Sequence, residues 1–292
     1  MRNASAWFVT MMCMALGASD DAFAQSSTEV TRHALDSLAV ETARLTMRYA
    51  DRRVAMSDGY RRLGTDFPGM GEHWLHSGAL MAGKIDASKP TLLSFANLDG
   101  RATLVGVGFV ITTRGDSAAL NIPGWPEHWH EHSGLLGDES GAAVGTPQGG
   151  ERSENETRVW VLHIWTALAN PAGPYASDNW ALPFARVGVA PPMDLDSEIG
   201  RALSLAVGGR RYLEAVLTDA KLLHDGNAER VRAALDTATV TAEQISKRLR
   251  ASGVASEADA RELREVWRTL GDQLRSLCGP AVNVLLAPPH GH

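Results

Sequence analysis

Histidine and tryptophan side chains are concentrated in one stretch of the chain, between Gly69 and Phe184. Six of the eight tryptophans and six of the ten histidines lie there. All of these except Trp180 fall in three segments: GMGEHWLH at 69–76, PGWPEHWHEH at 123–132 and VWVLHIW at 159–165. Imidazole nitrogen is a ligand that zinc, copper and iron accept readily, and indole rings form apolar walls around a site. The three segments therefore predict a histidine site for a transition metal, walled by tryptophan.

The leading ligand candidates come from all three segments: His73, His130, His132 and His163. If the middle segment is extended, alternate residues project from one face about 7 Å apart, so at most two of its histidines can meet one ion. His163 lies in an apolar segment, where a single histidine is more often a hydrogen-bonded core residue than a ligand. Further candidates for the metal site are His76, His128, Glu72, Glu131 and Asp178.

Other chemistries remain open or are excluded by the residues present. The residues Trp74, Trp125, Trp129 and Trp165 could instead line a groove for a small aromatic or carbohydrate ligand in a protein without enzymatic activity. In a third hypothesis, the chain is a structural or interaction protein, and the histidines and tryptophans only fill its core. There is no G-x-S-x-G, P-loop or dinucleotide-binding motif, so the sequence specifies no reaction.

The beginning of the chain has the pattern of a secretory signal peptide. Arg2 precedes an apolar run from Ala6 to Ala18, and Ala22-Phe23-Ala24 supplies a cleavage motif, which predicts a signal peptide over 1–24. Cleavage leaves Cys278 as the one cysteine, which excludes a thiolate metal site and an internal disulfide. We therefore expect a periplasmic or extracellular protein that binds a metal ion or a small molecule.

The charge and the hydropathy of the chain each argue against one class of partner. The formal net charge is −6 and there is no long basic block, so we expect no binding to nucleic acid. After the predicted signal peptide, no apolar run is long enough to span a bilayer, so we expect no stable membrane insertion.

The elements that must position the candidates change in type along the chain. Apolar residues at helical spacing predict an N-terminal helix over 25–58. In a β-containing domain over 59–190, we expect strands at 92–96, 102–111 and 157–168, with Asp99-Gly100 as the turn of a hairpin. On the second strand, Gly106 and Gly108 share a face, which indicates close approach of a backbone or a ring.

The remaining segments complete the predicted architecture. The polar, glycine-rich stretch 136–155 is either a lid or an insertion without a fixed structure. Three helices over 191–280 should form a bundle: one that bends at Gly208-Gly209, a second that stops at Gly253 and a third that starts at Ser256. A flexible tail should follow over 281–292. The predicted fold is α+β, with a small central antiparallel sheet packed against a bundle of N- and C-terminal helices.

The histidine segments and the loop NPAGPYASDN resemble a set of uncharacterised exported bacterial proteins. In that set, Met-Gly-x-His, His-x-His and His-x-Trp followed by Asn-Pro-x-Gly recur in the same order. The resemblance covers roughly 60–184 and implies no activity. It implies that the segments form one site, and the residues that match its motifs are His73, His130, His132, His163, Asn170 and Asn179.

Overall fold

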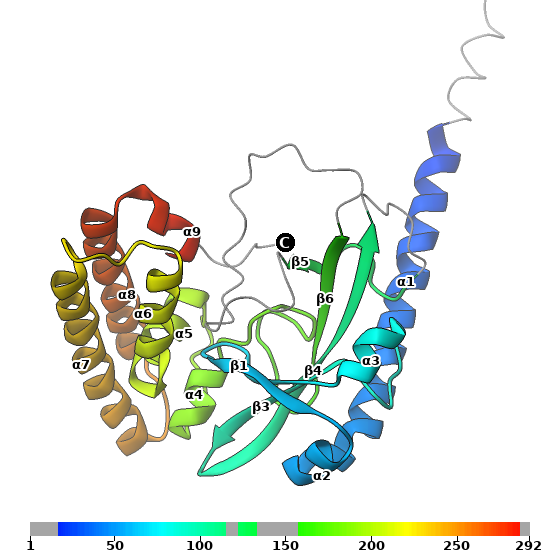
Figure 1. Ribbon diagram of the computed structural model, residues 1–292, viewed down its shortest axis with the longest axis horizontal. Helices are drawn as coiled ribbons and strands as arrows, with labels where there is room; N and C mark the ends of the chain where they lie inside the picture. Colours follow the sequence, from blue (N-terminus) through cyan, green and yellow to red (C-terminus); the bar gives the residue numbers. More distant parts are fainter. Residues whose placement is uncertain (1–16, 115–121, 133–156, 287–292) are drawn as a thin grey trace, which may run out of the picture.

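The computed structural model describes residues 17–114, 122–132 and 157–286 (Figure 1). Most of the predicted signal peptide and the stretch 136–155 lie outside the described residues. The predicted α+β fold with a central antiparallel sheet is confirmed. The sheet lies between the N-terminal helix and the C-terminal helices, which are on opposite sides of it in Figure 1.

The sheet is antiparallel throughout, with the strand order β1-β2-β3-β4-β6-β5. Its strands are β1 (Arg61–Phe67), β2 (Gly71–Leu75), β3 (Leu92–Leu98), β4 (Arg101–Arg114), β5 (His130–His132) and β6 (Thr157–Trp165). The predicted hairpin is confirmed: Asp99 and Gly100, with φ values of 50° and 77°, join β3 to β4 as a tight turn. The strands β1, β2 and β5 were not predicted as strands.

The α1 side of the sheet carries its larger core. The helix α1 (Gly17–Thr46) contributes Leu35 to this core, and the sheet contributes Phe109 from β4 and Leu162 from β6. The prediction of one continuous N-terminal helix over 25–58 is wrong at its end. The helix α1 ends at Thr46 and is followed by a 3-10 helix (Met47–Ala50). A separate helix, α2 (Arg52–Ser57), then begins, and Asp51 caps its first turn.

A β-bulge exchanges the two faces of β4. Ser94 pairs with Gly106 but Phe95 pairs with Leu104, so Val105 has no partner of its own on β3. Leu104 therefore packs in the core under α1, and Val105 packs on the opposite face. The strict alternation expected along this strand is wrong at these two positions, because a bulge shifts the two-residue period by one.

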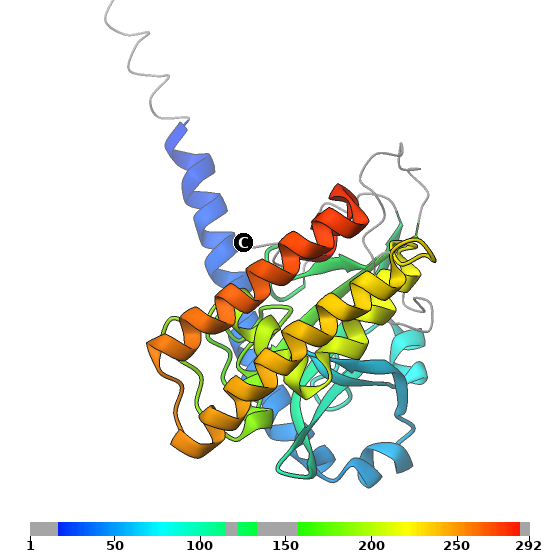
Figure 2. The ribbon, with the colours of Figure 1, turned by 90° about the vertical axis from the view of Figure 1, so that its left-hand side faces the viewer.

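The C-terminal helices have a separate core. They are α4 (Leu182–Val187), α5 (Ser197–Ser204), a 3-10 helix (Leu205–Val207), α6 (Gly209–Asp219), α7 (Ala228–Ser252) and α8 (Glu257–Cys278). The helices α7 and α8 run side by side in opposite directions (Figure 2). The expected start and stop signals are confirmed: Ser256 forms a capping box with Asp259, and Gly253 ends α7 with a φ of 74°.

Two predictions about this region need correction. The segment 203–220 is not one bent helix, because Gly208 separates α5 and its 3-10 extension from α6. The segment predicted as a flexible tail begins with ordered structure: a 3-10 helix (Pro280–Val282) and α9 (Asn283–Leu286) place Val282 and Leu286 in the helical core. Burial of these two apolar side chains holds the first residues of the segment against the C-terminal helices.

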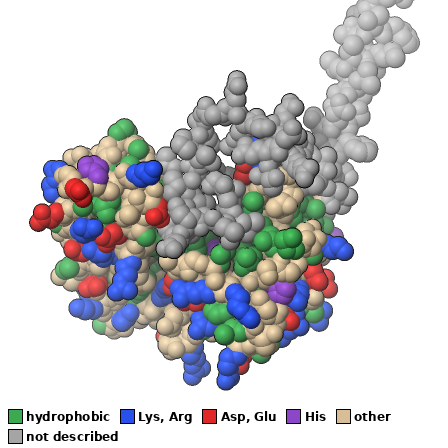
Figure 3. Space-filling view, in the orientation of Figure 1, with side chains coloured by type: hydrophobic (Ala, Val, Ile, Leu, Met, Phe, Trp, Pro, Cys, Tyr) green, Lys and Arg blue, Asp and Glu red, His purple; other side chains and the backbone are tan. Residues whose placement is uncertain are grey.

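The edge strand β1 is protected by charge. Arg61 and Arg62 are exposed on it, and Lys and Arg side chains are prominent over β1 in Figure 3. Charged side chains on an edge strand disfavour pairing with the sheet of another molecule. The helical part of the same view carries both signs of charge.

The β1–β2 turn depends on a glycine. Gly71 has a φ of 81°, and a Cβ added there would lie 2.5 Å from the carbonyl oxygen of Phe95. We predict that Gly71→Ala lowers the free energy of unfolding by about 3 kcal/mol, measured by urea denaturation, because it adds a backbone clash to the strain of a positive φ.

The matched control is Gly83→Ala, where φ is 59° and no atom lies within 4 Å of the added Cβ. It should cost only about 1 kcal/mol. Equal losses for the two variants would show that the contact with β3 does not constrain the turn.

Candidate functional site

Three of the four leading histidine candidates meet on one face of the sheet. We call His73 of β2, His163 of β6 and His130 of β5 the histidine row. The ring centroids of His73 and His163 are 5.7 Å apart, and those of His163 and His130 are 5.1 Å apart. His73 and His163 are 8% and 2% exposed, and His130 is half-buried. The row therefore runs from the interior of the protein to the edge strand β5.

Strand pairing explains how the row forms. His163 pairs with Gly108 and His130 pairs with Val161, so His130 and His163 project from the same face of adjacent strands. His73, in contrast, lies three strand spacings from β6, which would be about 14 Å in a flat sheet. The two side chains can meet because the residues between them are small: Ser94 on β3, and Gly106 and Gly108 on β4.

The two glycines also confirm the expected close approach. A Cβ at Gly106 would lie 3.0 Å from the carbonyl oxygen of Ile164 and 3.3 Å from the ring of Trp165. A Cβ at Gly108 would lie 3.2 Å from the side chain of Leu92. Both positions therefore exclude larger residues, which leaves room above them for the imidazoles.

Two aromatic residues extend the row toward the C-terminal helices. The ring of Phe67, at the end of β1, lies 4.9 Å from that of His73 at an interplanar angle of 33°. Tyr212 of α6 packs edge-on against Phe67, with a centroid distance of 5.7 Å. Neither residue was a sequence candidate, because neither lies in a histidine segment. The one sequence signal that could have suggested Phe67 is its position two residues before the glycine-rich segment that begins at Gly69.

Two of the three carboxylate candidates, Glu72 and Glu131, lie on the opposite face of the sheet. Glu72 precedes His73 on β2 and forms ion pairs with Arg52 at 3.0 Å and Arg62 at 3.6 Å. Glu131 follows His130 on β5 and lies 3.8 Å from Arg158. Alternation along a strand directs both carboxylates away from the row, so the structure does not bring them to the histidines.

His76 and His128 also lie apart from the row. His76 caps α3 (Ser77–Ala82): its Nδ1 accepts from the amide of Ala79 at 2.9 Å, and its Nε2 lies 3.0 Å from the carbonyl oxygen of Asp58. Both ring nitrogens of His76 are thus used within the fold. The ring of His128 packs against Tyr175 at 5.1 Å, near α1.

His73 and His132 both lie in strands. His73, in the glycine-rich segment 69–76, lies within β2 and pairs with Ser94. His132 pairs with Val159 at the end of β5, and its side chain is outside the described residues. Its backbone register places it on the same face of β5 as His130.

The tryptophans do not wall the row as predicted. Trp74, Trp125 and Trp129 pack in the core on the α1 side of the sheet, where Trp125 meets Trp160 edge-on at 4.8 Å. Trp165 alone among the four candidates shares the face of His163, and its indole nitrogen donates to the carbonyl oxygen of Ala176 at 2.7 Å. Alternation along β2 directs Trp74 away from His73, and alternation along β6 directs Trp165 to the face of His163.

The loop from Asn170 to Asn179 is organised by its two asparagines. The Asn170 amide donates to the carbonyl oxygen of Asp178 at 2.8 Å. Asn179 is 0% exposed; its amide donates to Leu168 at 3.1 Å and its oxygen accepts from Ala181. The backbone amide of Asn179 also donates to the carbonyl oxygen of Gly69 at 2.8 Å. Asn179 therefore stabilises this turn and joins it to the β1–β2 turn.

Asp178 has an unusual environment within this loop. Burial raises its pKa to about 6, although the positive charge of Arg201 on α5 acts in the opposite direction. Burial also raises the pKa of Tyr212 to about 12, with a further contribution from Asp178. Asp178 thus lies among groups of the C-terminal helices. The charge of Arg201 and the ionisation of Tyr212 are thus coupled electrostatically to Asp178, and no sequence pattern indicated either residue.

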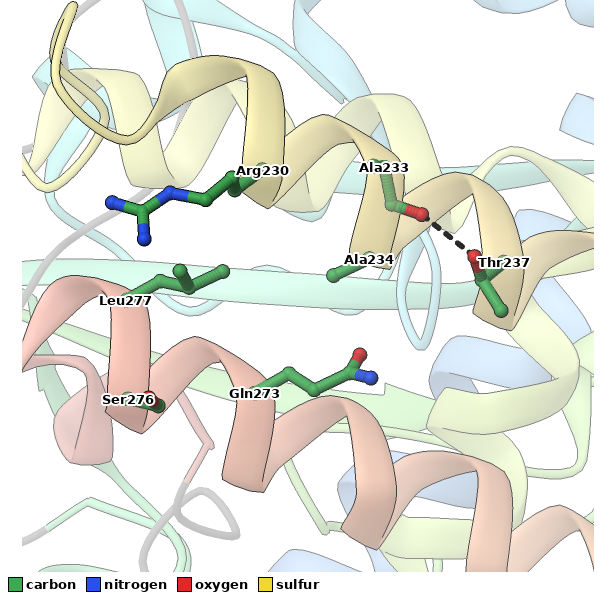
Figure 4. Close-up of a pocket in the computed structure, with 7 residues that line it drawn as sticks. All are labelled: Arg230, Ala233, Ala234, Thr237, Gln273, Ser276 and Leu277. Atoms are coloured by element: carbon green, nitrogen blue, oxygen red, sulfur yellow. Dashed lines mark hydrogen bonds between the residues drawn. The ribbon is translucent and has the colours of Figure 1, made fainter.

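Two hollows in the described part of the protein are lined by residues outside the histidine row. One, about 830 Å³, lies between α1 and the segment 76–89. The other, about 400 Å³, lies between α7 and α8 (Figure 4). Small side chains make up three of its seven lining residues (Ala233, Ala234 and Ser276), and Arg230 and Leu277 lie together at one end. Neither hollow carries a cluster of histidines or carboxylates suited to catalysis.

The described residues contain no preformed metal cluster: no group of three or more His, Cys, Asp or Glu side chains among them is arranged to hold a metal ion. None of the helices searched in that part of the chain is long and apolar enough to cross a membrane. The chain matches no family model, no curated protein and no solved structure.

The role of Asn179 can be tested directly. We predict that Asn179→Ala lowers the free energy of unfolding by about 3 kcal/mol, because it leaves buried backbone groups of Leu168 and Ala181 without partners. Denaturation by urea, followed by circular dichroism, measures the change. The exposed Asn283 is the control, and Asn283→Ala should cost less than about 1 kcal/mol. A small loss for Asn179→Ala would contradict the structural role of this side chain.

Proposed function

We propose that the protein binds one transition-metal ion, of zinc, copper or iron, through His73, His130 and His163, with His132 as a further candidate ligand. The observation that carries the proposal is the convergence of three histidines from strands far apart in the sequence. Neutral imidazole is a ligand for all three metals. Because the predicted signal peptide directs export, the proposed site would operate outside the cytoplasm.

The spacing of the rings supports a shared ion. Two imidazoles bound tetrahedrally to one ion, with metal–nitrogen distances of about 2.0–2.1 Å, have ring centres about 5 Å apart. The two spacings along the row, 5.1 and 5.7 Å, are close to this value. Each spacing is thus compatible with an ion between two neighbouring rings, and a site that includes both His73 and His130 requires the rings at the two ends of the row to turn toward His163.

The orientation of the rings requires one adjustment. The rings of His130 and His163 are stacked, with 9° between their planes. Nitrogen lone pairs lie in the ring plane, so stacked rings direct them to different points. We propose that the His130 ring turns when the ion binds, since His130 is half-buried on a three-residue edge strand. Such a change of rotamer leaves the backbone in place.

The stacked rings also favour a second hypothesis, in which the row is a purely structural part of the interior. In that case the histidines pack as flat polar rings, and their loss would only destabilise the fold. The predicted ligand groove is less well supported, because Trp74, Trp125 and Trp129 lie in the core on the other face.

Metal binding by untagged protein tests the proposal. We predict about one equivalent of a single metal after exposure to zinc, copper or iron and gel filtration, measured by elemental analysis. His163→Ala should weaken binding at least about 100-fold, because it removes the central ligand of the row. Calorimetric titration with that metal measures the affinity.

Two matched variants control this experiment. His224→Ala removes an exposed histidine and should leave metal binding unchanged. His76→Ala should also keep binding but lower stability by about 1–2 kcal/mol, because the cap of α3 is lost. Failure of the unaltered protein to retain any metal would reject the proposal and favour the structural hypothesis.

A further inference from the structure

The larger of the two hollows lies between α1 and the segment 76–89, and we call it the α1 hollow. Its volume is about 830 Å³, within the range of about 300–1,000 Å³ that is typical of small-molecule sites. Two of its lining residues come from α1, four from α3 and the start of that helix, and six from the loop 84–89. None of them belongs to the histidine row, so the α1 hollow is a separate candidate site.

Hydrogen bonds hold the walls of the α1 hollow in place. The His76 ring caps α3, and a Cβ added at Gly78 would lie 3.0 Å from that ring. In the loop, Oδ1 of Asp86 accepts from the amide of Ser88 at 2.8 Å and from its hydroxyl at 2.7 Å. Arg48 donates to the carbonyl oxygen of Ser88 at 3.0 Å. The hollow is therefore a preformed feature of the fold, as most small-molecule sites are.

Apolar and small side chains form much of the lining. Ala79, Ala82 and Ala87 leave space because each ends at Cβ, and Leu45 and Ile85 are half-buried and present larger apolar surfaces. Water on such surfaces is released when an apolar group of a ligand covers them. The lining thus favours a ligand that carries aliphatic side chains.

Two of the charged residues that line the α1 hollow are compensated within the fold. Nζ of Lys89 lies 3.8 Å from Oδ1 of Asp58, and the carboxylate of Asp86 accepts the hydrogen bonds of its own loop. The other two, Glu41 of α1 and Lys84 of the loop, are exposed. In the part of the chain that the structure describes, neither forms an ion pair within 4 Å, although they carry opposite charges and line the same hollow. One anion and one cation therefore remain available to a ligand.

The separation of these two charges indicates the class of ligand. A carboxylate attracts an ammonium group, and a lysine attracts a carboxylate, so the pair matches a zwitterion. Glu41 and Lys84 lie too far apart to meet each other, and a peptide separates its two terminal charges by about 3.3–3.6 Å for each residue. A short peptide also brings the aliphatic side chains that the lining favours.

We propose that the α1 hollow binds a short apolar peptide with free ends. The N-terminal ammonium group of the peptide lies at Glu41, its C-terminal carboxylate lies at Lys84, and its side chains cover Leu45 and Ile85. This binding is independent of metal, because no residue of the histidine row takes part.

Calorimetric titration of the metal-free, full-length mature protein with tri-leucine tests the proposal. We expect saturable binding of one peptide. Acetylation of the peptide's N-terminus removes its positive charge, and amidation of its C-terminus removes its negative charge. Each change should weaken binding about 3- to 10-fold, the effect of one partly exposed charged contact.

Two variants assign each end of the peptide to its residue. Glu41→Gln should weaken binding of tri-leucine about 3- to 10-fold and should have no further effect on the acetylated peptide, because the same contact is already lost. Lys84→Gln should behave in the same way toward the amidated peptide. Glu243→Gln and Lys247→Gln, at exposed positions of α7, are the matched controls and should leave binding unchanged.

A variant that fills the α1 hollow locates the binding site. Ala82 is exposed and lines the hollow, so Ala82→Phe should weaken binding of tri-leucine at least about 10-fold without loss of stability. Ala233→Phe, which makes the same change in the hollow between α7 and α8, should have no effect.

Three results would overturn the proposal. They are no binding of tri-leucine at a concentration of about 5 mM, binding that is unchanged in Ala82→Phe, and losses for Glu41→Gln that are the same with the free and the acetylated peptide. Because the titrations contain no metal, their failure is distinguishable from failure of metal binding at the histidine row.

Discussion

Imidazoles from β2 and β6 can share the middle of one sheet face only because the strands between them carry almost no side chain there. Ser94, Gly106 and Gly108 leave the room, and the close contacts of both glycines with neighbouring backbone or side chains exclude larger residues. The rest of the site follows from this constraint. The ring of Phe67 packs against that of His73, and β5 adds His130 at the other end of the row. A larger residue at any of these three positions would separate the histidines.

Much of the fold could be predicted from local sequence patterns. Asp99-Gly100 determines a tight hairpin, and Ser256 with Asp259 determines the start of α8, because each signal acts within four residues. The strands β1 and β2 carry no such signal, since charged residues dominate β1 and glycine obscures the start of β2. The bulge at Val105 was also unpredictable, because it depends on pairing with β3 and not on the sequence of β4 alone.

The sequence was sufficient to predict the histidines of the candidate site but not the residues that pack around them. Residue type and clustering along the sequence were enough to single out His73, His130 and His163. If the segment of His130 is extended, alternation predicts that Glu131 lies on the other face of the sheet. The corresponding prediction for Glu72 and His73 requires knowing that β2 is a strand. Tyr212 and Arg201 belong to helices more than a hundred residues from the β1–β2 turn, so only the packing of the folded chain places them near the site.

Metal binding by the histidine row requires that its three imidazoles act as one set of ligands. X-ray absorption spectroscopy of the protein loaded with its preferred metal measures this most directly, because imidazole rings give a characteristic outer-shell scattering. We predict about three imidazole ligands at about 2.0–2.1 Å if the metal is zinc, and fewer in His163→Ala. A spectrum with oxygen ligands and no imidazole scattering would contradict the proposed site, and the histidines would then be part of the core alone.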